Sequence, residues 1–331
     1  ILKGMLESRA EIAAIVNNPE EPTFENTILA LEVSGESLNK VLNVFGNLSN
    51  TDTNDTIQAL EAEIYPMLTR ERNAVTFNPV LFARVKSVYD RKDSLGLDEQ
   101  DARLVELTYR NFVRAGAGLS PDVQAEVGAI NEQLSTLTTQ FGQNLLNATK
   151  SFKYEVTDES RLAGLSPDLK TALKVPGEDR WLIGVDRAVF EDVMKSAEDR
   201  ELRRALFDGY RLRASSGEYD NGPAAIKIAQ LRARKAELMG YKSHADYVLE
   251  NRMAKTPEVA MDFLAQVLAP GLQRADEEIA DMQALAGDTL TISGEDYWYY
   301  SEKVRAQKYA FDESALRPYL EAGAVRKGTF A

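Results

Sequence analysis

The sequence has no cysteine and one histidine, His244, among its 331 residues. Without cysteine there is no disulfide, no thiolate nucleophile and no thiolate metal ligand, which is compatible with a reducing compartment. A hydrolytic zinc site of the helical type needs two histidines one turn apart with a glutamate between them. This chain has too few imidazoles to build such a site.

Long apolar runs and excess positive charge are also absent. No apolar stretch reaches the roughly 18 to 20 residues that a membrane-spanning helix needs. Acidic residues number 52 against 39 basic ones, and the net charge of -13 repels polyanions. We therefore expect neither a membrane nor a nucleic-acid partner. We expect a cytoplasmic protein. Because the chain begins at Ile1 inside what reads as a helix, this expectation does not extend to whether a targeting segment lies upstream.

The pattern that dominates the sequence is helical periodicity. Ser120 and Pro121 are a cap and a first helical residue, and an apolar stripe with steps of three or four follows as far as Leu145. Similar patterns predict long helices over 2–16, 25–50, 98–115 and from Pro257 onward, with Pro270 kinking or splitting the last. Shorter helices are predicted over 78–90, 188–196, 199–214, 222–239 and 293–309.

Strand signal is confined to residues 152–157 and 181–185, on either side of a loop-rich stretch. The fold class predicted is therefore mainly α, with minor strand content. We expect three parts, namely a long-helix region over 1–151, a loop-rich connection with short strands over 152–185, and a second helical region over 186–331.

His244 is the first residue to test for chemistry, since a lone imidazole with Asp246 nearby could hold a metal weakly. We favour an ordinary surface or capping role, because one histidine does not make a catalytic metal site. The glycines within 114–118 follow a helix and lack the lysine of a phosphate loop, so we interpret them as a helix end.

Three further groups of side chains allow a functional interpretation, but a structural interpretation is simpler for each. The acids Glu277, Glu278 and Asp281 read as a solvated helix face. The aromatic tract 297–300 could line a groove, but we favour core packing and a helix contact. The arginines within 200–213 alternate with acids and read as a solvated face of ion pairs. No catalytic, cofactor-binding or metal-binding residue is assigned.

Short strings along the whole chain resemble the peptidyl-dipeptidase and oligopeptidase A branch of the thimet oligopeptidase family of zinc metallopeptidases. They lie at 9–15, 18–19, 22–28, 30–32, 34–35, 112–117, 141–144, 162–165, 200–203, 209–214, 236–241, 253–257, 316–319, 328 and 330. One departure is Glu295-Asp296, where the family commonly has Trp-Asp.

The resemblance implies an almost wholly helical fold with two lobes around a narrow channel that admits short unstructured peptides. It implies that the full-length enzyme holds zinc, which activates a water for hydrolysis, and releases C-terminal dipeptides. The zinc motif of the family lies beyond the position matching Phe330 and has no counterpart in this chain. By resemblance this portion forms a channel wall, binds no cofactor itself, and is inactive without a C-terminal catalytic half as its partner.

An alternative is a non-catalytic helical module that binds peptides or proteins. A portion cut from a larger enzyme should also leave apolar side chains facing water, and such a patch drives association. We therefore expect dimers or a comparable contact in solution.

Overall fold

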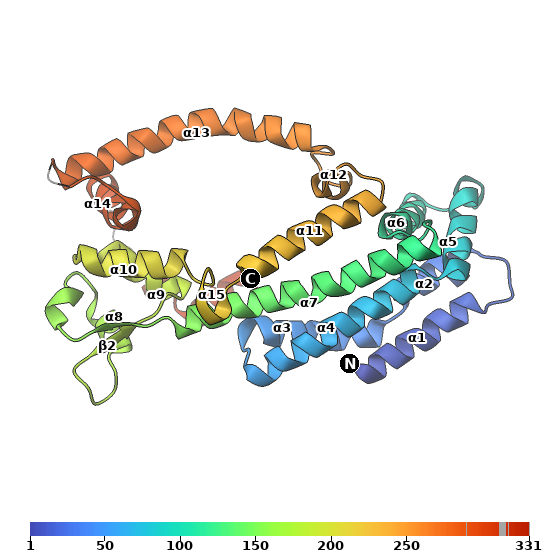
Figure 1. Ribbon diagram of the computed structural model, residues 1–331, viewed down its shortest axis with the longest axis horizontal. Coiled ribbons are helices and arrows are strands. Elements are labelled where there is room, and N and C mark those ends of the chain that lie inside the picture. The colour runs from blue at the N-terminus through green and yellow to red at the C-terminus, as the bar shows by residue number, and fades with distance from the viewer. Residues whose placement is uncertain (289, 311–315, 317, 331) are drawn as a thin grey trace. The chain divides into compact units, whose positions relative to one another are not determined.

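A computed structural model of the chain describes residues 1–288, 290–310, 316 and 318–330 (Figure 1). The fold is mainly helical, as predicted, and two short strands form the one sheet within this part of the chain. No helix in it is long and apolar enough to cross a membrane. Arg317, which falls in one of the strings that resemble the peptidase family, lies outside the described residues.

The elements follow one another along the chain with short connections. They are α1 Leu2–Val16, η1 Phe24–Leu29, α2 Ala30–Val33, α3 Glu36–Thr51, α4 Asp55–Thr76, α5 Pro79–Arg91, η2 Lys92–Ser94, α6 Glu99–Ala115, α7 Pro121–Ser151, β1 Tyr154–Val156, η3 Glu159–Leu162, α8 Pro167–Leu173, β2 Trp181–Ile183, α9 Arg187–Ser196, α10 Arg200–Arg211, η4 Gly217–Tyr219, α11 Gly222–Leu238, α12 His244–Leu249, α13 Pro257–Ala286, η5 Gly294–Asp296, α14 Tyr297–Tyr309 and α15 Ala322–Thr329.

Most predicted elements are confirmed, and the local chemistry explains their ends. Asp98 caps α6 by accepting from the Asp101 N–H, and Gly116 ends that helix in the left-handed conformation. α7 begins at Pro121, as the sequence predicts. The two predicted strand segments pair antiparallel, with Glu155 opposite Leu182.

One prediction about a long helix is wrong, and another is wrong in one of its two alternatives. Residues 25–50 do not form one helix, because Gly35 takes a φ of 74° and separates α2 from α3. α13 continues through Pro270, so the helix is not split there. One long helix was not predicted at all: α4 contains Pro66 and begins at the cap Asn54, whose side chain accepts from the Ile57 N–H.

The contacts divide the chain into two compact units, and the three-part division made from the sequence stays a prediction. The first unit comprises Ile1–Gln143 and Asn221–Pro257, and the second comprises Asn144–Asp220 and Glu258–Ala331. The core of the first unit gathers around α5 and α6. Its buried members are Ile15, Phe24, Ile28, Leu81, Val85, Val88, Val105, Phe112 and Ala117.

The second unit has its own core between the small sheet and helices α9 and α10. Its buried members are Val156, Leu162, Leu165, Leu173, Trp181, Ile183, Val185, Phe190, Val193, Met194, Ala197, Leu202 and Leu206. Trp298 of α14 packs on this core, with its ring 5.4 Å from that of Phe190. Each unit therefore buries a separate set of apolar side chains.

A tight turn beside the second core gives a test of packing. Gly164 has a φ of 88°, and a Cβ there would overlap the carbonyl oxygen of Ser196. We expect Gly164→Ala to lower the free energy of unfolding by about 2 to 4 kcal/mol, from left-handed strain plus overpacking. The matched control is Gly177→Ala in the same unit, where φ is 79° but no atom lies within 4 Å. It should lose only about 1 to 2 kcal/mol from strain. Thermal unfolding of both variants measures the difference, and equal losses would contradict the packing argument.

Candidate functional site

The most concentrated group of charges in the second unit joins α10 to the short helix η5. Arg203 Nη2 lies 2.9 Å from Asp296 Oδ1, and Arg200 Nη2 lies 2.8 Å from Asp296 Oδ2. Arg204 Nη1 lies 2.8 Å from Glu295 Oε1. Side chains of Asp296 and Arg203 are 0% and 2% exposed. We call these five residues the Arg203–Asp296 cluster.

The hydrogen bonds given for the central cation, Arg203, engage four of its five N–H donors. Besides Asp296, Arg203 donates to the carbonyls of Ala197, Glu198 and Glu295 at 2.8 to 3.2 Å. Its guanidinium also lies over the ring of Tyr299, 4.2 Å from the centroid. The interpretation of the arginines within 200–213 as a solvated face is thus wrong for Arg203, although exposed arginines of α10 do pair along the helix with Asp208.

The electrostatics of Asp296 make it a structural carboxylate. Burial by itself raises the pKa of Asp296, but hydrogen bonds from Arg200 and Arg203 outweigh it and lower the pKa from 3.8 to about 2. The carboxylate is therefore ionised at neutral pH with both oxygens occupied. It does not match what a general acid or base requires, since such a group has a pKa near the working pH.

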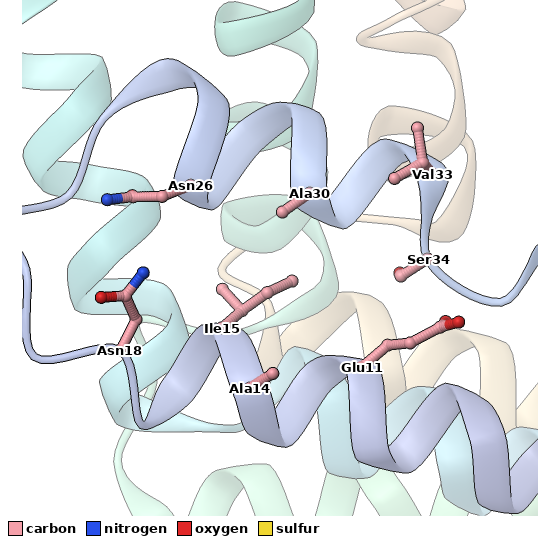
Figure 2. Close-up of a pocket in the computed structure, with 8 residues that line it drawn as sticks. All are labelled: Glu11, Ala14, Ile15, Asn18, Asn26, Ala30, Val33 and Ser34. Atoms are coloured by element: carbon pink, nitrogen blue, oxygen red, sulfur yellow. The ribbon is translucent and has the colours of Figure 1, made fainter.

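A surface cavity of about 380 Å³ in the first unit lies between α1 and the segment η1–α2 (Figure 2). Its polar side chains are already engaged. Glu11 accepts from the Gly35 N–H at 2.6 Å, and Asn26 accepts from the Thr23 N–H and from Arg84 at 2.8 and 3.0 Å. Asn18 accepts from the Glu20 N–H, and Ser34 donates to the Leu31 carbonyl. The other four lining residues are apolar. The cavity can admit a small molecule but presents no set of groups for catalysis.

The buried arginine beside this cavity, Arg84, joins a helix to a loop by hydrogen bonds. Arg84 of α5 donates to the backbone carbonyls of Asn18 and Glu20, at 3.0 and 3.2 Å, as well as to Asn26. It thereby holds the loop between α1 and η1 against α5. Part of this loop lies in the strings that carry the family resemblance, and here its backbone carbonyls are held by Arg84.

His244 lies at the start of α12, half-buried, and the helix cap is Ser243, not the histidine. Its pKa is lowered by burial, with smaller contributions from the charges of Arg232 and Lys235. Asp246 accepts a hydrogen bond from the Ser243 hydroxyl at 2.6 Å. In the part of the chain that the structure describes, no three His, Asp or Glu side chains gather as a metal site requires.

The remaining groups singled out in the sequence are placed as interpreted. Gly116 ends α6. Trp298 enters the core of the second unit, whereas Tyr297 is half-exposed. On α13, Glu277 and Glu278 pair with Arg274, and Asp281 pairs with Lys308, all at exposed positions.

Comparison with known proteins shows what the chain is similar to. Residues 193–331 match peptidase family M3. The chain is 37% identical to the dipeptidyl carboxypeptidase of Escherichia coli over 99% of its own length and 50% of the relative's. It is 25% identical to oligopeptidase A of Salmonella typhimurium, over 100% of the chain and 50% of the relative. It is 27% identical to an organellar oligopeptidase A of Arabidopsis thaliana, over 94% and 41%.

These similarities define a mainly helical relative of oligopeptidases, and the chain spans about half the length of the curated relatives it matches. The chain belongs to peptidase family M3. The family implies zinc for its full enzymes. The donors present here do not fit that ion, since the chain has one histidine and no cysteine and the described residues gather no ligand set.

The Arg203–Asp296 cluster predicts a large cost for removing its anion. Asp296→Asn keeps the shape but leaves Arg203 buried without a counter-charge, so we expect it to lower the free energy of unfolding by about 3 to 5 kcal/mol. Asp208→Asn is the matched control, because its ion pairs with Arg204 and Arg211 are exposed, and it should cost less than about 1 kcal/mol. Urea unfolding measures both, and similar losses would contradict the assignment.

The parent chain and its Asp296→Asn variant also give a prediction for how stability depends on pH. Because the folded pKa of Asp296 is below its unfolded value of 3.8, the ionised carboxylate stabilises the fold above about pH 4, and this contribution fades as the pH falls toward 2. The stability difference between the parent and Asp296→Asn should therefore be constant above pH 4 and shrink below it. Unfolding curves recorded across this range test it, and a difference that grows on acidification would contradict it.

Proposed function

We propose that this chain is the substrate-channel portion of a zinc-dependent peptidase that hydrolyses short unstructured peptides and releases C-terminal dipeptides. The observation that carries the proposal is the 37% identity to a dipeptidyl carboxypeptidase across nearly the whole chain. Dipeptide release is favoured over internal cleavage because the identity to oligopeptidase A relatives is lower, at 25% to 28%. The role assigned to this portion is steric, as a wall that selects extended peptides.

The ligand set explains why the portion is proposed to need a partner. Zinc hydrolysis requires three protein ligands and an open position for water. This chain offers one imidazole, at His244, and its nearest sequence carboxylate, Asp246, is bonded to Ser243. We therefore propose that the zinc ligands come from a catalytic half outside this chain, and no step of hydrolysis is assigned to residues here.

The surface of α13 supports a missing partner. Its first half exposes large apolar side chains over more than one face, and just one residue of the helix, Met282, is buried. The exposed residues, which we call the α13 apolar face, are Val259, Met261, Phe263, Leu264, Val267, Leu268 and Leu272. A helix that is apolar most of the way round is typical of a buried position. We propose that the catalytic half covers this face in the whole enzyme.

Activity and metal content test the proposal together. The purified chain should contain no stoichiometric zinc by elemental analysis and should leave a short quenched peptide intact. Adding the catalytic half of an M3 relative, produced separately, should restore peptide cleavage with release of C-terminal dipeptides. Turnover by this chain alone, with one bound zinc per molecule, would contradict the proposal that the zinc ligands come from a catalytic half outside it. Failure of every complemented sample to cleave would favour a non-catalytic binding module.

The α13 apolar face predicts self-association of the chain by itself. We expect dimers or larger species in concentrated solution, because apolar patches beyond a few hundred Å² drive association. Phe263→Glu, at a position 64% exposed within the face, should shift the population toward monomer. The control is Ile226→Glu on α11, where an isolated apolar side chain is 63% exposed. Light scattering over a concentration series measures this, and a clean monomer for the unmodified chain would contradict it.

A further inference from the structure

A lysine of the first unit is held by a chain of hydrogen bonds through two asparagine side chains, with no carboxylate in the chain. Lys235 of α11 is partly buried, and its Nζ donates to Asn131 Oδ1 of α7 at 2.7 Å. Asn131 donates in turn to Asn73 Oδ1 of α4 at 2.9 Å, and Asn73 donates to the Gly128 carbonyl at 3.3 Å. The relay fixes the position of the ammonium group. It uses one of the three donors that a lysine carries.

The side chains around Lys235 add positive charge and no described counter-charge. Arg72 of α4 is close enough for its charge to act on Lys235, and Arg232 and Lys235 both act on His244. Burial, followed by the charge of Arg72, lowers the pKa of Lys235. Among the described residues, Arg72 and Arg232 form no ion pair, although Glu71 and Arg234 on the same helices do, with Arg9 and Glu126 respectively.

His244 completes the group with an unused ring atom. Its Nδ1 is shielded from solvent and has no hydrogen-bond partner among the described residues. Its ring centroid lies 6.3 Å from that of Tyr247, and Lys235 Nζ lies 5.8 Å from the same Tyr247 centroid. The imidazole and the ammonium thus share one aromatic neighbour. The acid nearest in sequence, Asp246, bonds to Ser243.

Lys235 has fewer acceptors than the buried arginines among the described residues. Arg203 bonds to a carboxylate and three carbonyls, and Arg84 bonds to two carbonyls and an amide oxygen. In the same part of the chain, Lys235 Nζ bonds to Asn131 Oδ1 alone. A partly buried cation beside further cations is unfavourable unless an anion compensates it. Paired ionic hydrogen bonds to arginine and lysine are strong and suit the oxygens of phosphate. A bound anion would have the sign that compensates the charges around Lys235.

We propose that Lys235, Arg72, Arg232 and His244 form a binding site for a small oxyanion of the phosphate type. The ammonium of Lys235 is the fixed contact, the two guanidinium groups supply donors from α4 and α11, and the imidazole lies beside them. All four residues belong to the first unit. The site is separate from peptide hydrolysis and goes beyond the function proposed above, so its test does not depend on that function.

The single histidine provides a direct readout. Inorganic phosphate is titrated into the full chain at fixed pH and constant ionic strength, and the imidazole proton signals of His244 are followed by NMR. We expect one saturable shift, because no other imidazole contributes. Lys235→Gln should weaken binding at least about tenfold, as expected for loss of an ionic hydrogen bond. Lys227→Gln on the same helix, outside the group, should leave the binding curve unchanged.

Two further arms separate the possible results. Sulfate should compete with phosphate, whereas acetate at equal concentration should bind at least about tenfold more weakly because it carries one charge fewer. If Lys235→Gln does not fold, the exposed double variant Arg72→Gln with Arg232→Gln takes its place and should also lose affinity. A shift that does not saturate, equal binding of acetate, or unchanged binding in a folded variant of the group would each overturn the site.

Discussion

The buried pair of Arg203 and Asp296 is the constraint on which the second unit depends. An unpaired charge at either position would cost several kcal/mol, so the chain must bring η5 back onto α10 across a sequence separation of 93 residues. Once η5 is placed, Trp298 two positions later has to enter the core beside Phe190. The ion pair thus fixes the register of α14, and the apolar contact adds the free energy of burial. Neither contact would form in the same place without the other.

Local chemistry explains why much of the fold could be predicted from the sequence. The cap Asp98, the first helical residue Pro121 and the αL glycine Gly116 each act within a few residues, so their effects can be predicted from the linear sequence. The sequence-based predictions fail where residues distant in sequence determine the local structure. Gly35 lies inside an apolar pattern that favours one helix, yet its N–H bonds to Glu11 of α1, 24 residues away. The periodic pattern carries no information about that bond.

The features of the candidate site likewise fall into those that the sequence predicts and those that depend on residues distant in sequence. The lack of a zinc ligand set follows from counting imidazoles and thiols, which needs no structure. Burial of Arg203 was missed because its neighbours Arg200 and Arg204 also read as a charged face, and its anion lies far along the chain. The group around Lys235 was missed for a related reason, since its members come from α4, α11 and α12 and Lys235 is held by an asparagine of α7. A large sequence separation between cations and their partners is the feature these misses share.

The two halves of α13 show how one helix can meet two environments. Its second half carries Arg274, Glu277 and Asp281, whose exposed ion pairs suit water. Its first half, from Val259 to Leu272, has Asp262 as its sole charged residue. Both unit cores form without contributions from that first half, so its apolar side chains are not needed to fold this chain. Helix formation would tolerate charged residues at these exposed positions, and solubility would favour them. Their apolar character therefore indicates selection for contact with another surface.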